Sequence, residues 1–282
     1  MSETPLTSAQ HLVSAGTLGV CRRMVTSGPF IVSVTEHTRG FSSHTHVHER
    51  ASVNIVLAGA YAESLAGEKV LAPAGTVMLK PAWQEHANEF RTAGARCLLI
   101  EITPPGQALI DEAATMFDVA EHRPLATDPL ALQRLEAMLR NDVGACGVEL
   151  EECVYELLLP LARQIHLREE RRPDRWLSRV REIIAETMLR APSLGELAES
   201  VNRHPAHVAR AFKSRHGCTI STYVRRQRIG RAAHLLRTTS LPVSAIAYDV
   251  GFYDHAHLTR EFRRVAGVTP TAYRGRREDS EP

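Results

Sequence analysis

The sequence lacks the features of a membrane-spanning or secreted protein. Its 282 residues contain no apolar run near the roughly 20 residues that a membrane span needs. The first residues, Met1–Pro5, have neither the basic region nor the apolar core of a signal peptide. The five cysteines form no C-x-x-C pair and are widely scattered: Cys21, Cys97, Cys146, Cys153 and Cys218. We therefore expect free thiols, a cytoplasmic location and no insertion into a membrane.

Common catalytic signatures are also absent. The chain has no G-x-x-x-x-G-K-[ST] loop, no G-x-S-x-G elbow and no H-E-x-x-H helix, so nothing supports a nucleotide hydrolase, a serine hydrolase or a zinc protease. What is present is ordinary: 44% hydrophobic and 23% charged residues, close to the globular average. This length and composition fit one large domain or two smaller ones and exclude a disordered or fibrous chain.

The charges are distributed unevenly along the chain. The net charge of +2 divides into +8 for Trp176–Pro282 and −6 for the first 175 residues. A basic C-terminal third points to nucleic acid or a membrane surface as its partner.

The first hundred residues have the pattern of short strands. Apolar runs of four to six residues alternate with Gly, Pro and polar turns, at 31–34, 53–57, 75–79 and 97–100. Many short strands at close spacing favour an antiparallel sandwich or barrel. Beyond them, 128–141 and 148–170 carry Leu at helical spacing and predict amphipathic helices.

The C-terminal third reads as helices only. We predict them at 176–189, 194–201, 206–216, 220–236, 243–250 and 255–265. Ser193 and Ser244 stand where helices start, and Gly217, Gly251 and Gly267 stand where helices stop. A short helix, a tight turn and a second helix occur twice, which is the helix-turn-helix arrangement.

Each second helix has one buried and one free face. The pairs Val208/Phe212 and Leu258/Phe262 are spaced i, i+4 and should anchor the helices on the core. Arg210 and Arg260 then lie on another face, available to a major groove. From residue 203 to 237 there are nine Arg and Lys residues and no acid, a run that phosphate neutralisation explains.

The segment Trp176–Arg277 resembles the DNA-binding domain of the AraC/XylS family of bacterial transcription regulators, most clearly over Asp249–Arg274. The resemblance implies two helix-turn-helix units, joined by the helix at 220–236, that read successive major grooves. By position, the family's base-facing residues fall on Ala206, Ala209, Arg210, His255, Ala256 and Arg260. The alanines suit van der Waals contact, for example with a thymine methyl group, and the two arginines are the best candidates for hydrogen-bond readout. Phosphate contacts are expected from His207, Lys213, Thr259 and Arg263.

The N-terminal part resembles a second family through its histidines. In the alternating segment His44–His48, three imidazoles fall on one face of a strand. The segment resembles the two-part cupin motif. The first part is formed by these histidines with Gly40 and Gly59, and the second by Gly75, Pro81 and His86. Regulators of the AraC type commonly carry a cupin-like barrel ahead of the DNA-binding domain. The chain departs from the motif in having Ser52 at the Glu position, Trp83 at a Gly position and Phe90 at an Asn position.

Two interpretations of these histidines remain open. In the first, His46, His48 and His86 bind a divalent metal, with His44 or Glu49 as a further ligand. In the second, the histidines line a small-molecule pocket without metal. A cupin enzyme would need both a metal and a catalytic group, and the missing glutamate argues against one.

We therefore predict a two-domain α+β transcription regulator that is not an enzyme. Its expected parts are an N-terminal tail (1–19), a cupin-like β-barrel (20–105), a helical dimerisation segment (106–168), a linker (169–175), an all-α domain (176–277) and a C-terminal tail (278–282). Its expected partners are promoter DNA, a small-molecule effector in the barrel, a second copy of the chain and, if it activates, RNA polymerase. The alternatives are a metal-dependent cupin, acting as metal sensor or dioxygenase-like enzyme, and a nonspecific architectural DNA binder.

Overall fold

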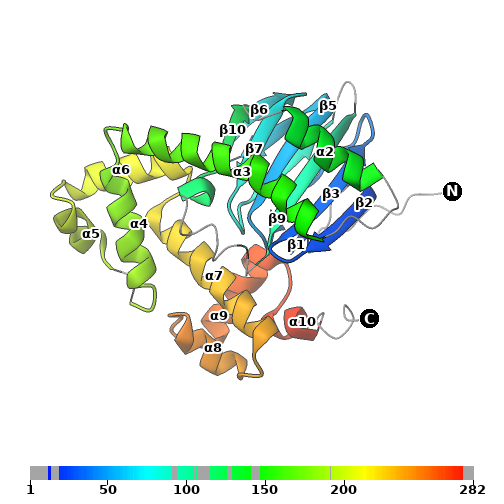
Figure 1. Cartoon of the computed structure of the whole chain (residues 1–282). Coiled ribbons are helices and arrows are strands. Elements are labelled where there is room, and N and C mark those ends of the chain that lie inside the picture. Colours follow the sequence, from blue (N-terminus) through cyan, green and yellow to red (C-terminus); the bar gives the residue numbers. More distant parts are fainter. Residues whose placement is uncertain are drawn as a thin grey trace. The chain divides into compact units, whose positions relative to one another are not determined.

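A computed structural model describes residues 12–13, 19–65, 67–90, 94–103, 106, 115–125, 129–140, 147–190 and 192–275 (Figure 1). The chain divides into two compact units, an N-terminal unit over Val13–Arg172 and a C-terminal unit that begins at Pro173. Cys146 and the expected tail 278–282 lie outside the described residues. The other four cysteines are free thiols. None of the described helices is both long and apolar enough to cross a membrane.

The N-terminal unit is built on an antiparallel sheet. Its strand order is β10-β7-β5-β9-β3-β2, with β2 at Val20–Ser27, β3 at Phe30–His37, β5 at Ser52–Leu65, β7 at Thr76–Lys80, β9 at Ala95–Ile102 and β10 at Glu121–Pro124. The second half of β5 leaves this sheet and pairs with β6 (Glu68–Pro73) and β8 (His86–Glu89). The short strands β1 (Leu12–Val13) and β4 (Val47–His48) pair with each other. Because β5 takes part in two sets of pairings, it connects two layers.

Apolar side chains fill both sides of this sheet. On one side, helices α2 (Pro129–Arg140) and α3 (Gly147–Glu170) lie across the strands (Figure 1) and bury residues such as Leu135 and Leu157 against Val32 and Ile100. On the other side a smaller cluster forms from Val56, Tyr61, Met78, Phe90 and Cys97. This second side contains the histidine-lined pocket.

The sheet differs from the sequence-based prediction in two respects. The described strands do not close into a barrel, since β10 and β2 remain as edges, although the double layer is compatible with a cupin-like fold. Strand β10 also lies within 106–168, where only helix was expected, and pairs with β7 from Glu121 opposite Leu79 onward. Its four residues, Glu-His-Arg-Pro, are too short and too polar to give a strand pattern, so only the pairing partner reveals it.

The described residues of the C-terminal unit form helices and no strand, as predicted. Its helices are α4 (Trp176–Glu186), α5 (Leu194–Ser200), α6 (Pro205–His216), α7 (Ile220–Thr238), α8 (Val243–Asp249), α9 (His255–Ala266) and the unexpected α10 (Pro270–Gly275). Ser193 and Glu196 form a capping box at the start of α5. Gly217 and Gly267 end α6 and α9 with φ of 65° and 75°, values that a residue with a Cβ rarely adopts.

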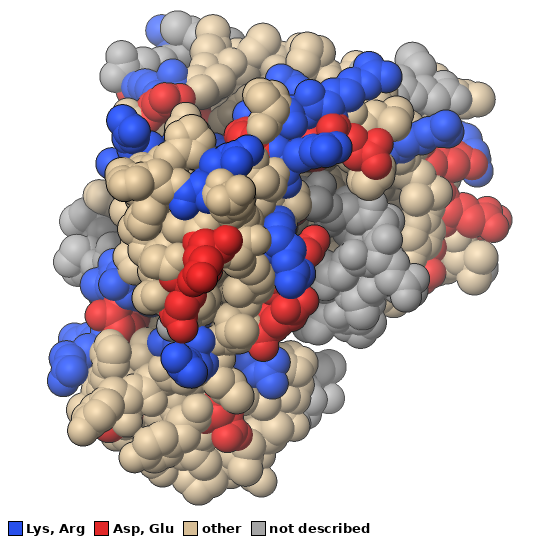
Figure 2. Space-filling view, turned by 90° about the vertical axis from the view of Figure 1, so that its left-hand side faces the viewer, with Lys and Arg blue, Asp and Glu red and all other residues tan. Residues whose placement is uncertain are grey.

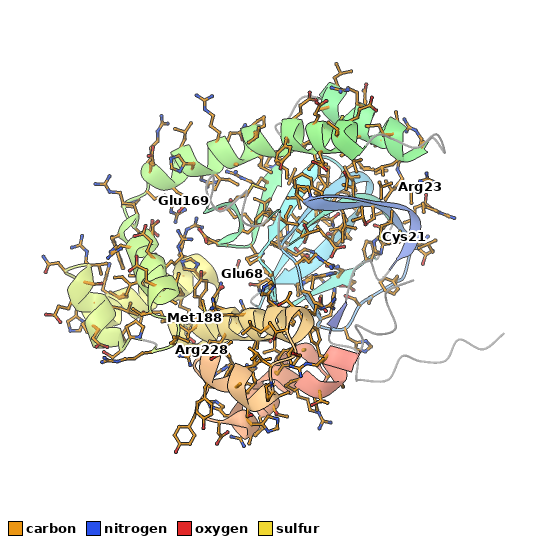
Figure 3. The ribbon with its side chains drawn as sticks, turned by 60° about the horizontal axis from the view of Figure 1, so that its bottom comes forward. Cys21, Arg23, Glu68, Glu169, Met188 and Arg228 are labelled. Atoms are coloured by element: carbon orange, nitrogen blue, oxygen red, sulfur yellow. The ribbon has the colours of Figure 1, made fainter. Side chains whose placement is uncertain are left out.

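One arginine of α7 connects the segment after α4 with the turn after α8. The Arg228 guanidinium donates from Nε and Nη2 to the Met188 carbonyl, at 3.1 and 2.9 Å, just beyond the end of α4 (Figure 3). A Cβ on Gly251 would lie 2.7 Å from the Leu189 carbonyl and 2.9 Å from Arg228 Nη2, so the turn after α8 requires glycine for space as well as for its φ of 83°.

Candidate nucleic-acid interface and histidine pocket

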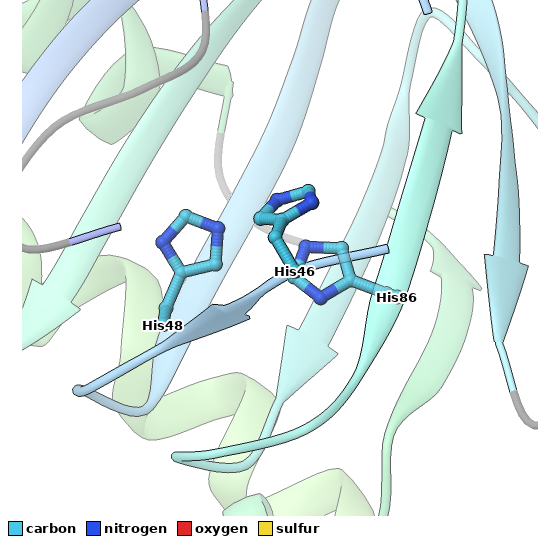
Figure 4. A group of neighbouring side chains, drawn as sticks. All are labelled: His46, His48 and His86. Carbon is cyan, nitrogen blue, oxygen red and sulfur yellow. The ribbon is translucent and has the colours of Figure 1, made fainter. Parts of the chain in front are cut away.

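The three predicted histidines come together in the N-terminal unit. His46 and His86 exchange backbone hydrogen bonds of 2.9 and 3.0 Å, and His48 follows two residues later on the same face (Figure 4). One ring nitrogen from each of these histidines lies within 4.8 Å of the others. The His44 side chain is exposed and only its carbonyl takes part, and Glu49 does not join the cluster.

A strained residue holds the turn between these histidines. Trp83, which stands at a glycine position of the cupin motif, has a φ of 62°. This backbone conformation costs a bulky residue roughly 1–2 kcal/mol, which burial of the indole offsets. The Trp83 amide donates to the His48 carbonyl at 2.8 Å, so the turn fixes the strand that carries His46 and His48.

Hydrogen bonds define the tautomers of two rings. Nδ1 of His46 lies 2.9 Å from the His44 carbonyl, and Nδ1 of His86 lies 3.0 Å from the Gln84 carbonyl. Because a carbonyl only accepts, each Nδ1 carries the hydrogen and each Nε2 presents a lone pair. Burial lowers the pKa of His46 to about 4 and holds the pKa values of His86 and His48 well below the usual range, so all three rings are neutral at pH 7.

Two charged residues that the sequence-based prediction missed complete the cluster. Lys80 Nζ lies 3.0 Å from Glu63 Oε1 and 3.2 Å from His86 Nε2, and both side chains are buried, at 5% and 0% exposed. The second oxygen of Glu63 is 2.8 Å from His122 Nε2. Burial alone would raise the pKa of Glu63, but Lys80 and His122 hold it well below its usual range. The sequence does contain one signal for this pair, since a lysine and a glutamate stand at inward-facing positions of otherwise apolar strands.

These contacts bear on metal binding. Three neutral imidazoles within 4.8 Å of one another are a suitable donor set for a divalent ion. However, Lys80 uses the lone pair of His86 Nε2, and its positive charge opposes a second cation at the same place. With Lys80 in this position, the cluster does not fit a metal ion.

A small pocket adjoins the cluster. Three of its polar atoms are buried without a hydrogen-bond partner among the described residues: His37 Nδ1, His46 Nε2 and Asn54 Oδ1. Such atoms are rare in folded proteins unless a ligand or water satisfies them. The lining combines these groups with apolar walls and comprises Thr35, His37, Phe41, His46, His48, Asn54, Lys80, Asn88 and Leu99.

In the C-terminal unit the predicted helix-turn-helix repeat is present. The turn after α5 places Asn202 at a φ of 50° and closes with a bond from Arg203 N to Ala198 O of 2.9 Å. The turn after α8 places Gly251 at 83° and closes with the equivalent bond, Phe252 N to Ala247 O, of 2.8 Å. Two stretches 49 residues apart therefore adopt the same turn.

The second helices, α6 and α9, expose the side chains that the family resemblance selects. Val208, Phe212, Leu258 and Phe262 are 0% exposed, as their spacing predicted. Arg210 and Arg260 are exposed, and Arg210 Nε contacts its own helix at the Ala206 carbonyl. Of the other candidates, Ala209 and Thr259 are half-buried, and the rest are exposed: Ala206, His207, Lys213, His255, Ala256 and Arg263.

Part of the acid-free run 203–237 is explained by contacts within the C-terminal unit rather than by phosphate binding. Arg225 pairs with Glu261 at 2.9 Å, Arg228 binds main-chain carbonyls, and Arg237 stacks on and donates to Tyr273. These arginines hold α7 to its neighbours and are not free for phosphate. On the face of the molecule drawn in Figure 2, basic and acidic side chains lie beside one another, without one continuous basic patch.

Comparisons with known proteins agree with this architecture. A family model described as a helix-turn-helix domain matches residues 197–276. The arabinose operon regulatory protein of Escherichia coli is 28% identical over 81 residues, which cover 29% of this chain and 28% of that protein. A putative AraC-like transcription regulator of Streptomyces antibioticus is 30% identical over 155 residues, or 51% of this chain and 50% of that protein. The chain thus matches half or less of the length of these relatives.

Solved structures extend the likeness to both units. The structure of ToxT from Vibrio cholerae has a TM-score of 0.50 at 11% identity, over 88% of this chain and 98% of that one. ToxT bound to an unsaturated fatty acid gives 0.51, also at 11% identity. At this identity the likeness concerns the fold, a β-sheet domain followed by a helical domain. The C-terminal unit therefore contains a helix-turn-helix domain similar to those of AraC-type transcription regulators, and the two units share the fold of ToxT.

Proposed function

We propose that the chain is an effector-controlled transcription regulator that reads promoter DNA through α6 and α9. The observation that carries this proposal is the repeated unit, in which each second helix buries its apolar pair and presents an arginine to solvent. Base contacts come from Ala206, Ala209, Arg210, His255, Ala256 and Arg260, with Arg210 and Arg260 as hydrogen-bond readers. His207, Lys213, Thr259 and Arg263 bind phosphates.

The N-terminal unit is proposed as the sensor. Its pocket combines apolar walls with buried polar atoms that lack partners in the described part of the chain, which is the composition of a small-molecule site. A ligand that binds one arrangement of the regulator better than another shifts the population toward it. Regulation of DNA binding therefore requires only a difference in ligand affinity between two states.

The helices of the sensor unit are proposed to carry a homodimer contact. Val148 and Leu159 of α3 are 62% and 56% exposed, and Leu130 of α2 is also exposed. Exposed apolar side chains of this size suit a subunit interface. A dimer would place two DNA-binding units on a repeated or inverted site in the cytoplasm, and an activator would also contact RNA polymerase.

Sequence-specific binding separates this proposal from its alternatives. Purified protein is titrated with the DNA upstream of its own gene and with a shuffled duplex of equal length and composition, at fixed salt. A regulator binds the upstream DNA 10³-fold or more tightly. Equal binding to both duplexes would indicate an architectural DNA binder, and no binding to either, with turnover in an oxidation assay, would indicate a cupin enzyme.

A further inference from the structure

The histidine cluster already contains a cation. We infer that the Lys80 ammonium, bound to His86 and Glu63, keeps a metal ion out of the cluster of His46, His48 and His86, so that the cluster binds no divalent metal until Lys80 is removed. The inference concerns the N-terminal unit only and stands whether or not the chain regulates transcription.

The donors around Lys80 are those that a metal would use. Its ammonium lies 3.2 Å from the unprotonated Nε2 of His86 and 3.0 Å from a carboxylate oxygen of Glu63. Imidazole nitrogen and carboxylate oxygen are the usual ligands of zinc and related ions, although at 2.0–2.2 Å rather than at hydrogen-bond distance. The distances therefore describe donors arranged around an ammonium group.

The carboxylate reaches the cluster from an unexpected position. Ser52, at the glutamate position of the cupin motif, lies directly opposite Lys80 in the pairing of β5 with β7. Glu63 lies eleven residues further along β5, in the half of the strand that pairs with β6 and β8. Since β8 also begins with His86, the long strand brings Glu63 to the histidines in the fold although the motif has lost its glutamate.

Charge completes the argument. Lys80 and Glu63 are both buried and neutralise each other. A divalent ion would add two positive charges beside a buried ammonium, which is unfavourable at such short range. Removing Lys80 reverses the balance, because it leaves a buried carboxylate and three imidazoles that lack a cation.

The test measures metal binding by the full chain without a His-tag. The parent, Lys80→Ala and a Lys80→Ala/His86→Ala double variant are incubated with Zn²⁺, freed of excess metal and analysed by plasma mass spectrometry. Lys69→Ala is the matched control, because Lys69 is an exposed lysine of the same unit that pairs with Glu89. We expect near-stoichiometric zinc in Lys80→Ala alone, and a zinc-dependent rise of the thermal midpoint in that variant but not in the parent.

Two results would overturn the inference. One is near-stoichiometric zinc in the parent that is lost in His46→Ala, because Lys80 would then not exclude metal. The other is a Lys80→Ala variant that keeps the parent's circular dichroism spectrum and takes up no zinc. If Lys80→Ala fails to fold because Glu63 is left unpaired, Lys80→Met/Glu63→Gln removes both charges and keeps the three imidazoles. This variant should bind zinc, although more weakly than three imidazoles together with a carboxylate would. A folded form of it that binds no zinc counts against the inference.

Discussion

At the scale of single residues, the pair Lys80 and Glu63 is the most consequential feature of the N-terminal unit. Both charges are removed from water, and each depends on the other and on its histidine neighbours for compensation. Removing one partner of a buried ion pair is much more costly than removing an exposed charge.

Glu63→Gln should therefore destabilise the protein strongly. The Lys80 ammonium would stay buried without a counter-charge, at a cost of about 3–5 kcal/mol in the free energy of unfolding. Urea unfolding followed by circular dichroism measures this cost. Glu68→Gln is the control, because Glu68 is exposed on β6. Equal stabilities of the two variants would show that the buried pair is not formed in solution.

The neutral histidines make stability depend on pH. His46 has its pKa lowered to about 4 in the folded state, whereas an unfolded histidine titrates near 6.5. Below pH 6.5 the unfolded chain therefore binds a proton that the folded chain does not, so the stabilisation present at pH 7 is lost as the pH falls. For His46 alone the loss between pH 7 and pH 5 is about 2 kcal/mol.

Urea unfolding of the parent and of His46→Gln at pH 7 and pH 5 tests this dependence. The variant should lose about 2 kcal/mol less than the parent over this interval. Carboxylates such as Glu63 act in the same direction but titrate in the unfolded chain near pH 4.3, so they contribute little here. An identical loss in both proteins would mean that His46 is not buried as a neutral ring.

At the scale of elements, helix ends in the C-terminal unit follow local rules. Ser193 accepts from the Glu196 amide at 3.2 Å, and Glu196 accepts from the Ser193 amide at 2.7 Å. Ser193→Ala should cost about 1 kcal/mol of stability. Ser244→Ala is the matched control, because Ser244 is exposed in the first turn of α8, where Pro242 is the N-cap. A control that loses as much as Ser193→Ala would contradict the assigned cap.

The two second helices predict which arginines read DNA. Arg210→Ala and Arg260→Ala should each weaken specific binding by about 1–3 kcal/mol and relax base preference at one position. Arg179→Ala is the control, since Arg179 pairs with Glu182 on α4, outside the helix-turn-helix units. Titrations of the upstream duplex and of single-base variants measure both effects. Unchanged affinity in either variant would show that the helix carrying that arginine does not read the DNA through it.

At the scale of the whole molecule, the two units have separate hydrophobic cores. Phe30, Leu98 and Leu157 belong to one core, and Leu177, Val208 and Phe212 to another. A unit with its own core folds independently as a rule. The fragment 173–282 should thus fold alone and bind the upstream DNA with base preference but without response to an effector. Loss of its helical circular dichroism spectrum would mean that its core depends on the N-terminal unit.

The helix-turn-helix unit was largely predictable from the sequence by itself. Helical periodicity, capping residues, glycine stops and the i, i+4 pairs act between neighbours in the chain, so they can be read without the fold. The same reasoning failed for the arginines of α7, because Arg225 and Arg237 find their partners, Glu261 and Tyr273, on other helices. A local charge run does not reveal which charges are already paired.

The histidine-lined pocket was decided by the tertiary structure. The sequence determined that His46, His48 and His86 belong together, because a spaced motif connects them. Lys80, Glu63 and Asn54 carry no such signal, and they meet the histidines only because β5 runs through both layers and pairs with β7 and β8. Long-range strand pairing thus determined the charge of the cluster, since a lysine and a glutamate on neighbouring strands become an ion pair only when the sheet buries them together.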